Sequence, residues 1–481
     1  MLMPVDLDCF GILRLGAKLL ECISVRSRLK TTNSTDHKMT DLILMSHPFI
    51  KNTIHDKLIG TIFGSAIGDC VGLYTEFLSK DLACKSYPDR KFSLLEPVTP
   101  FRYDSHRNKF TLQCWTDDTD HALLIVLAFL HTGDGSIPCS TDFASRLHIW
   151  VKQGLRCLDT LPVGLGSTVG RVVLDKTFLT DPHGTARKHW VSTGCHNAAN
   201  GSLMRCHPLG VMCLLKSLPE TFRVAANFSL ITHPDPRCVV SCCISVGLVR
   251  GLVLGEIIHE EQVDELIGRV VEWYESQRER KENTSAEEIQ VDDPSLDTAE
   301  LWKHTRAKDL SELQLDDSQK MGYVYKALGA SLLLLRIAMR EVAATFGRLK
   351  DKLNLFEKLI TSLVMEGGDA DTNACVAGAL LGAYLGYTAL PPPWRDGLKY
   401  SDWLLGKCES VSQVVGISQG KYDGKADPDT APDGGKGLLT DVDMEKRIQD
   451  FTMQILLKDK EQRCKEKMPR SGFRAIFERL K

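Results

Sequence analysis

The sequence predicts an all-α protein. Long apolar segments recur along the 481-residue chain, and most of them have the length of a helix rather than of a strand. Short alternating runs of β-branched residues between turns, which are typical of strands, are scarce. Capping residues and glycines mark the ends of several segments, as they do at helix termini.

The expected helices follow one another along the chain. The first begins near Asp56 and runs to Lys80, and residues 81–110, which contain three prolines, are expected to form a loop. The next helix ends before Gly133, a common helix stop. Including that helix, the later ones are expected at 118–132, 141–155, 237–257, 320–347, 353–365, 366–387 and 441–467.

Composition divides the chain into a main domain and peripheral parts. Residues 1–55 are expected to be a poorly ordered N-terminal extension. Residues 56–395 form the main domain, which a charge-dense, apolar-poor insertion at 274–319 interrupts. Residues 396–481 form a C-terminal extension, in which a linker rich in Gly, Pro and Asp at 417–437 precedes the amphipathic helix.

Composition also excludes several classes of partner and location. The chain is 43% hydrophobic with a net charge of −3, and it has no basic stripe with interleaved aromatics, so no nucleic-acid partner is expected. No run of 18 apolar residues occurs, so no membrane span is expected. The 16 cysteines include no CxxC pair, which indicates reduced thiols and an intracellular, cytoplasmic protein.

Two of the expected helix starts carry a similar set of polar side chains. Each combines two aspartates with a threonine: Thr116, Asp117 and Asp118 in one, and Asp369, Asp371 and Thr372 in the other. Capping alone explains either set, because carboxylates stabilise helix N-termini. If the fold brings the sets together, four carboxylates repel one another unless cations bind between them. All-oxygen ligands favour Mg²⁺, with Mn²⁺ as the alternative, over zinc.

A third acidic group lies on the first expected helix. Asp69, Gly72 and Glu76 share one side of that helix, at spacings of three and four residues. Gly68 and Gly72 permit another backbone to approach closely. On periodicity alone, however, a solvated helix end is the better explanation of these charges.

Two glycine-bearing stretches are suited to a phosphate or a ribose. Both 164-GLGSTVG-170 and 197-NAANGSLMR-205 expose backbone N–H groups and contain hydroxyl side chains. No strand is expected before Gly164, so a dinucleotide-binding Rossmann unit is not predicted. Arg205 suits either a phosphate or an internal carboxylate. His233 lies at a helix entry between prolines, where a structural histidine is more common than a functional one.

Together these motifs resemble the ADP-ribosylglycohydrolase family. The resemblance covers about residues 56–390, and the pairing of WTDDT with GDADTN before an Ala- and Gly-rich helix is highly specific. The matching stretches follow the family's order: GDCVGLYTE (68–76), WTDDTD (115–120), GLGSTVG (164–170), NGSLMR (200–205), THPD (232–235) and GGDADTNACVAGALLGAYLG (367–386).

The resemblance implies a compact, orthogonally packed multi-helix bundle with two Mg²⁺ ions in a cleft. The implied metal ligands are Thr116, Asp117, Asp118, Asp369, Asp371 and Thr372. The implied ADP-ribose pocket contains Gly166, Ser167, Gly201, Ser202 and His233. Glu76 is similar to a mobile-loop glutamate that contacts the metal or the reacting centre in some members, so Glu76, Asp117 and Asp371 are the expected catalytic residues.

The expected reaction is hydrolysis of the glycosidic bond at the anomeric carbon of ADP-ribose, in an ADP-ribosylated protein or a small ADP-ribose conjugate. Two alternatives stay open. A metal-dependent phosphohydrolase would also use clustered aspartates, but it would cleave the diphosphate of the nucleotide. A non-catalytic ADP-ribose-binding relative would have lost metal-ligand residues, and none of those residues is missing here.

Overall fold

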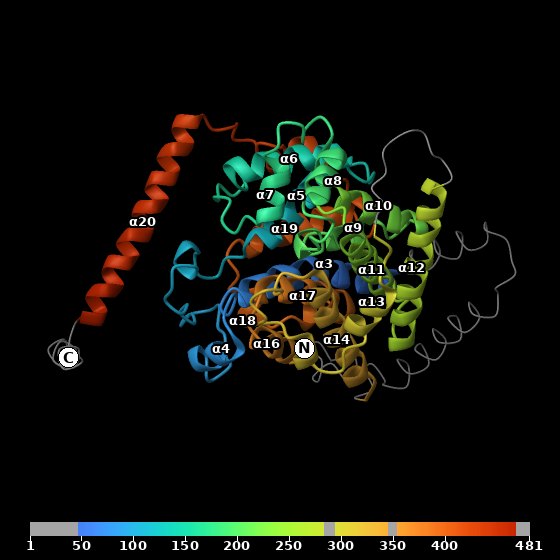
Figure 1. Cartoon of the computed structure of the whole chain (residues 1–481), viewed down its shortest axis with the longest axis horizontal. Coiled ribbons are helices and arrows are strands. Elements are labelled where there is room, and N and C mark those ends of the chain that lie inside the picture. The colour runs from blue at the N-terminus through green and yellow to red at the C-terminus, as the bar shows by residue number, and fades with distance from the viewer. Residues whose placement is uncertain (1–46, 283–293, 345–353, 468–481) are drawn as a thin grey trace, which may run out of the picture. The chain divides into compact units, whose positions relative to one another are not determined.

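The computed structural model describes residues 47–282, 294–344 and 354–467. Within these residues there are α-helices, short 3-10 helices and no strand beyond one isolated bridge between Ala199 and Tyr323, which confirms the all-α prediction. The α-helices are α3 (Pro48–Gly72), α4 (Lys80–Ser86), α5 (Asp117–Thr132), α6 (Ser140–Gln153), α7 (Ser167–Val173), α8 (Pro182–Ser192), α9 (His207–Met212), α10 (Leu218–Leu230), α11 (Pro236–Val253), α12 (Glu260–Glu282), α13 (Thr298–Thr305), α14 (Val324–Ala344), α16 (Leu355–Val364), α17 (Ala370–Leu385), α18 (Pro392–Arg395), α19 (Ser401–Val414) and α20 (Asp441–Lys467) (Figure 1).

The backbones of α3 and α17 touch along a row of glycines (Figure 1). Glycines recur every four residues along this face of α3, at positions 60, 64, 68 and 72. A Cβ on Gly64 would lie 2.4 Å from the carbonyl oxygen of Gly378, so no side chain fits there. At the last of these positions, a Cβ on Gly72 would lie 2.3 Å from the Cα of Asp371. The row therefore places the end of α3 beside the start of α17.

The helices α11, α14 and α17 form the core. Of the 16 residues of α17, Tyr384 alone is not buried, and the helix packs against α5, α11, α14 and α16. Within the described part of the chain, α11 is the one helix long and apolar enough to cross a membrane. It is 94% buried inside the structure, as is typical of a core helix.

The expected insertion at 274–319 is more regular than its composition suggests. It contains the end of α12, the whole of α13 and a 3-10 helix, η3 (Leu310–Leu313). Leu301 and Leu313 are buried, and α13 packs on α14, so a few apolar side chains hold a charged segment against the core. Residues 283–293 of the insertion and residues 1–46 of the N-terminal extension lie outside the described residues.

The segment expected to be a linker, 417–437, packs against α5 through the 3-10 helices η5 (Gly424–Ala426) and η6 (Pro428–Thr430). Lys407 of α19 pairs with Asp427 at 2.6 Å and with Asp429 at 2.9 Å. Aspartates that resemble those of a solvated linker are therefore partners of a buried lysine. Glycine there permits close backbone contact, since a Cβ on Gly424 would overlap the carbonyl oxygen of Leu130.

Candidate active site

The first turns of α5 and α17 meet at one location. The Oγ1 atom of Thr116, the residue before α5, lies 3.3 Å from Asp118 Oδ2 and 3.5 Å from Asp371 Oδ2. The two acidic sets, in which Thr116 and Asp371 are 255 positions apart, therefore share one buried cluster. Two groups of three carboxylates have ligand atoms within 4.8 Å of one another: Asp69, Asp118 and Asp371, and Glu76, Asp369 and Asp371.

Helix capping explains part of this cluster. The Thr116 hydroxyl accepts a hydrogen bond from the Asp118 backbone N–H at 3.4 Å, which is an ordinary N-cap. Asp369 occupies the corresponding position of α17, but its side chain makes no capping bond and accepts from Asn200 Nδ2 at 2.8 Å instead. Asp118 Oδ1 is buried without a hydrogen-bond partner among the described residues. Both aspartates therefore need an explanation other than capping.

Burial and mutual repulsion make the cluster unfavourable on its own. Burial first, and neighbouring carboxylates next, raise the pKa values of Asp117, Asp118 and Asp371 well above their usual range. Burial and then Glu76 raise the pKa of Asp369 as well. The neighbouring charges that raise these pKa values are all carboxylates, so a bound cation would compensate a charge that the protein leaves uncompensated.

The donor set fits a hard divalent cation. The orphaned Asp118 Oδ1 lies among carboxylate and hydroxyl oxygens, which are the ligands that Mg²⁺ prefers. The Thr372 side chain hydrogen-bonds to Asp118 and to Asp369, so its hydroxyl belongs to the same cluster. Of the six predicted ligands, Asp117 lies to one side. Its Oδ1 points at Gly164, where a Cβ would come within 2.2 Å of that oxygen.

The role of Asp69 in the cluster was not predicted from the sequence. The prediction that Asp69 and Glu76 lie at a solvated helix end is wrong, because Asp69 is completely buried and Glu76 is 6% exposed. Asp69 accepts from Thr116 N at 2.9 Å, from Thr119 N at 3.0 Å and from Thr119 Oγ1 at 2.6 Å. Through these bonds Asp69 positions the start of α5, and it also belongs to one of the two carboxylate groups that could hold a cation. Burial raises its pKa to about 6.

Glu76 lies in the turn after α3, and two segments hold it. His106 Nε2 lies 2.6 Å from Glu76 Oε2, and the buried Arg107 donates to the carbonyl oxygens of Tyr74 and Glu76. On the other side, Phe77 N donates to Gly368 O at 2.6 Å, directly before Asp369. His106 and Arg107 come from the expected loop at 81–110, where no periodicity or motif distinguishes them.

The expected substrate-binding residues fall into two environments. Gly166 and Ser167 are exposed at the start of α7, and a Cβ on Gly166 would meet no atom within 4 Å. Gly201, in the 3-10 helix η2 (Asn200–Ser202), lies against the His233 ring, where a Cβ would be 3.0 Å from Cε1. The Ser202 hydroxyl is turned into the interior and pairs with Ser229 Oγ at 3.0 Å.

A chain of hydrogen bonds holds the His233 ring. Arg205 Nη2 donates to Thr232 Oγ1 at 2.6 Å, and Thr232 Oγ1 lies 2.7 Å from His233 Nδ1. Burial, with the nearby Arg205 charge, lowers the His233 pKa to about 3, so the ring is neutral. The other ring nitrogen, Nε2, lies beside Gly201, where a Cβ would come within 3.1 Å of it.

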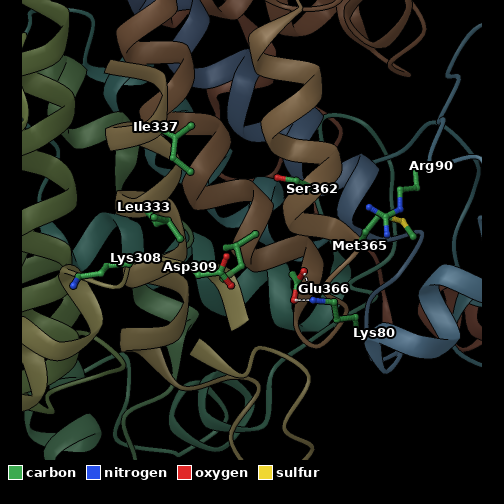
Figure 2. Close-up of a pocket in the computed structure, with 10 residues that line it drawn as sticks. Lys80, Arg90, Lys308, Asp309, Leu333, Ile337, Ser362, Met365 and Glu366 are labelled. Carbon is green, nitrogen blue, oxygen red and sulfur yellow. Dashed lines mark hydrogen bonds and ion pairs between the residues drawn. The ribbon is translucent and has the colours of Figure 1, made fainter. Parts of the chain in front are cut away.

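The structure also contains a pocket of about 310 Å³ (Figure 2). It is lined by Lys80, Arg90, Lys308, Asp309, Leu310, Leu333, Ile337, Ser362, Met365 and Glu366, and by none of the predicted site residues. Figure 2 shows Lys80 and Glu366 pointing toward each other, with Nζ and Oε2 2.8 Å apart. This ion pair joins the segment after Glu76 to the segment before Asp369.

Comparison with known proteins identifies the family. The family profile described as ADP-ribosylglycohydrolase matches residues 50–421. The chain is 26% identical over 359 residues to the ADP-ribosylarginine hydrolase Tri1 of Serratia proteamaculans, covering 74% of this chain and 79% of that one. It is 23% identical over 367 residues to the ADP-ribosylhydrolase ARH3 of Bos taurus, covering 74% of this chain and 92% of the relative.

A third relative is the ADP-ribosyl-[dinitrogen reductase] glycohydrolase of Rhodospirillum rubrum, which is 23% identical over 354 residues and covers 72% of this chain and 91% of its own length. The matched range contains both acidic helix starts, the turn with Glu76 and both glycine-bearing stretches. It also supports the expected class of enzyme, a hydrolase that acts on ADP-ribose linkages. The chain belongs to the ADP-ribosylglycohydrolase family.

Proposed function

We propose that this enzyme hydrolyses the glycosidic bond between the anomeric carbon of ADP-ribose and an ADP-ribosylated protein or a small conjugate, and that it depends on two Mg²⁺ ions, with Mn²⁺ as the alternative. One observation supports the metal most directly: the two acidic helix starts form one buried cluster whose neighbouring charges are carboxylates. The names of two relatives, an ADP-ribosylarginine hydrolase and an ADP-ribosyl-[dinitrogen reductase] glycohydrolase, support a protein-linked substrate.

The residues that would hold the cations are Thr116, Asp118, Asp369, Asp371 and Thr372, with Asp117 at the edge facing Gly164. Cations bound there supply charge that orients the ribose hydroxyls and a water molecule and makes that water more acidic. In this arrangement Asn200 and Asp69 position other residues that would hold the cations. Asn200 fixes the orientation of Asp369, and Asp69 fixes the turn that carries Thr116.

Glu76 is the proposed general base. Its carboxylate is within 4.8 Å of ligand atoms of Asp369 and Asp371, and His106 holds it from the opposite side. It takes the proton of the water that attacks the anomeric carbon while the glycosidic bond breaks. Positive charge develops on the ribose ring at that moment, and the surrounding carboxylates stabilise that charge.

The remainder of ADP-ribose is proposed to lie along the two glycine-bearing stretches. Gly166 and Ser167 offer an exposed backbone and an exposed hydroxyl, and the lack of a side chain at Gly201 lets the His233 ring pack against it. The neutral His233 ring, with its proton on Nε2, would donate a hydrogen bond to a ligand oxygen. Binding energy from these remote contacts orients the reacting carbon. The buried Ser202 does not face this part of the proposed pocket; its hydroxyl pairs with Ser229 in the interior and supports the glycine-bearing stretch from that side.

The test is product analysis with a panel of substrates. The protein is incubated with Mg²⁺ and peptides that carry ADP-ribose on arginine, on serine or as an acetyl ester, with and without a chelator. Release of intact ADP-ribose that the chelator abolishes is the expected result. AMP with ribose phosphate would identify a phosphohydrolase, and binding of ADP-ribose without turnover of any substrate would identify a binding protein.

We also propose an intracellular, cytoplasmic location. None of the 14 cysteines in the described part of the chain forms a disulfide, which supports the reduced thiols expected from the sequence.

A further inference from the structure

The C-terminal helix α20 (Asp441–Lys467) lies outside residues 50–421, which match the family. It nevertheless contacts the 3-10 helix η1 (Arg107–Lys109). Asp459 Oδ1 accepts from the Tyr103 hydroxyl at 2.5 Å and from Asn108 Nδ2 at 2.9 Å. The adjacent Lys458 donates to the Asn108 carbonyl oxygen at 3.3 Å. One turn of α20 thus makes three hydrogen bonds to residues 103–108.

The same short segment holds Glu76. His106 contacts the Glu76 carboxylate at 2.6 Å, and its ring packs on Phe77 and Phe110. Arg107 donates to backbone oxygens on the Glu76 turn and to Asp104 at 2.6 Å. Asn108, which α20 contacts, directly follows these two residues. The path from α20 to Glu76 is therefore one short, hydrogen-bonded segment.

The other end of α20 is also attached to the protein. Arg447 donates to the Asp159 carbonyl oxygen at 2.7 Å, and Gln153 exchanges two hydrogen bonds with the Leu439 backbone just before the helix. Between these ends, Met444, Phe451 and Ile455 are partly buried at helical spacing. The helix is therefore anchored near both ends, as a brace must be.

We propose that α20 is a brace that positions Glu76 through η1, with Asp459 as the positioning residue. The inference rests on the proposed function of Glu76. The bonds of Asp459 lie at the surface, where they contribute little to global stability. Their position matters more, because a small displacement of a catalytic group has a large effect on rate. A segment outside the matched family range thereby becomes part of the catalytic apparatus of this chain.

The test compares Asp459→Ala with Asp450→Ala in the full-length, Mg²⁺-loaded protein. Asp450 is an exposed acidic residue of the same helix for which no hydrogen bond or ion pair is described. We expect Asp459→Ala to lower kcat about three- to tenfold with KM little changed, since the two surface hydrogen bonds that Asp459 accepts are lost. Asp450→Ala should leave kcat unchanged. Asp459→Asn keeps a side-chain carbonyl acceptor and should restore most of kcat.

Amide hydrogen exchange supplies a readout that needs no substrate. Exchange at residues 74–80, where Phe77 N donates to Gly368 O, should become faster in Asp459→Ala and stay unchanged in Asp450→Ala. Faster exchange in a protein that cleaves no ADP-ribose linkage would support the brace and reject the proposed function. Unchanged exchange in Asp459→Ala, or an equal effect of the two alanine variants, would overturn the brace.

Discussion

Two buried aspartates at helix starts, Asp235 before α11 and Asp371 in α17, have opposite surroundings. Asp235 accepts from Trp190 Nε1 at 3.0 Å and from Arg237 Nη2 at 2.8 Å, so a protein cation compensates its charge. Asp371 accepts from Thr372 N at 2.8 Å, and the charges that act on its pKa are carboxylates. The comparison distinguishes a structural cap from a candidate site. A protein cation compensates the charge of Asp235, whereas only carboxylate charges act on Asp371, so we expect a cation from solution to bind there.

The largest expected effect is on catalysis. Asp371→Asn should lower kcat/KM about a thousandfold, because the change removes a charge shared by both carboxylate groups and worth several kcal/mol in the transition state. Thermal unfolding without a divalent cation should show an equal or higher midpoint, since a repelling buried carboxylate is gone. Activity near that of the wild type would remove Asp371 from the site.

The second prediction concerns cation binding and pH. Carboxylates with raised pKa values, such as Asp69 at about 6, favour the folded state when protonated, so their stabilising contribution is full below about pH 4 and is lost as pH rises through the raised values. Without a cation, the free energy of unfolding should therefore fall as pH rises from about 4 to about 6 because of Asp69, and should fall further above pH 6 as the more strongly shifted Asp371 ionises.

Mg²⁺ binds the ionised form and should reverse that loss. At a concentration 100 times its Kd it should add about 2.7 kcal/mol to the free energy of unfolding, with a larger effect at pH 8 than at pH 6. Calorimetry of wild type and Asp371→Asn at both pH values measures this. An identical cation response in the two proteins would contradict it.

The third prediction is the converse of the first, because the substitution is expected to lower stability and to leave the response to Mg²⁺ unchanged. Asp235→Asn should lower the free energy of unfolding by about 2 kcal/mol, because Arg237 loses its charged partner; the effect is below that of a fully buried pair, since the Arg237 side chain is 25% exposed. Its response to Mg²⁺ should equal that of the wild type. Denaturant unfolding with and without the cation measures both quantities. A large loss of Mg²⁺ response with unchanged stability would show that the comparison of the two aspartates is mistaken.

The sequence alone was sufficient for the all-α class, for the long apolar helices and for the two acidic starts, because these depend on local patterns. It did not predict shorter helices such as α4, which lies in the expected loop at 81–110, or α8 and α9. The local pattern could not distinguish a capping aspartate from a site aspartate. In both 232-THPD-235 and 367-GGDADT-372 an Asp stands at the start of a helix, and the local sequence gives the same signal. What separates them lies outside that local pattern. Asp235 has Arg237 two residues later and the distant Trp190 as partners, whereas the distant Asp118 and Glu76 surround Asp371.

Residues that act through tertiary contacts were the hardest to predict. Asp69 is buried because glycines on one face of α3 bring α17 into backbone contact, a packing that periodicity only suggests. His106 reaches Glu76 from a loop with no motif. Charged composition also misleads when a few apolar side chains suffice for packing, as with Leu301 in the expected insertion.

The smallest expected effect tests whether a residue that hydrogen-bonds to a predicted ligand contributes to Mg²⁺ affinity. Asn200 donates to Asp369 at 2.8 Å and is itself 7% exposed, so it orients a carboxylate. Asn200→Ala should weaken Mg²⁺ affinity about tenfold, as outer-sphere changes commonly do. Asn197→Ala is the matched control, because Asn197 lies on the same stretch but donates to Thr168 Oγ1. Titration calorimetry measures both affinities. Equal affinities would mean that Thr372 and the backbone hold Asp369 without Asn200, and the site would then depend only on the two helix starts and on the glycine row that joins α3 to α17.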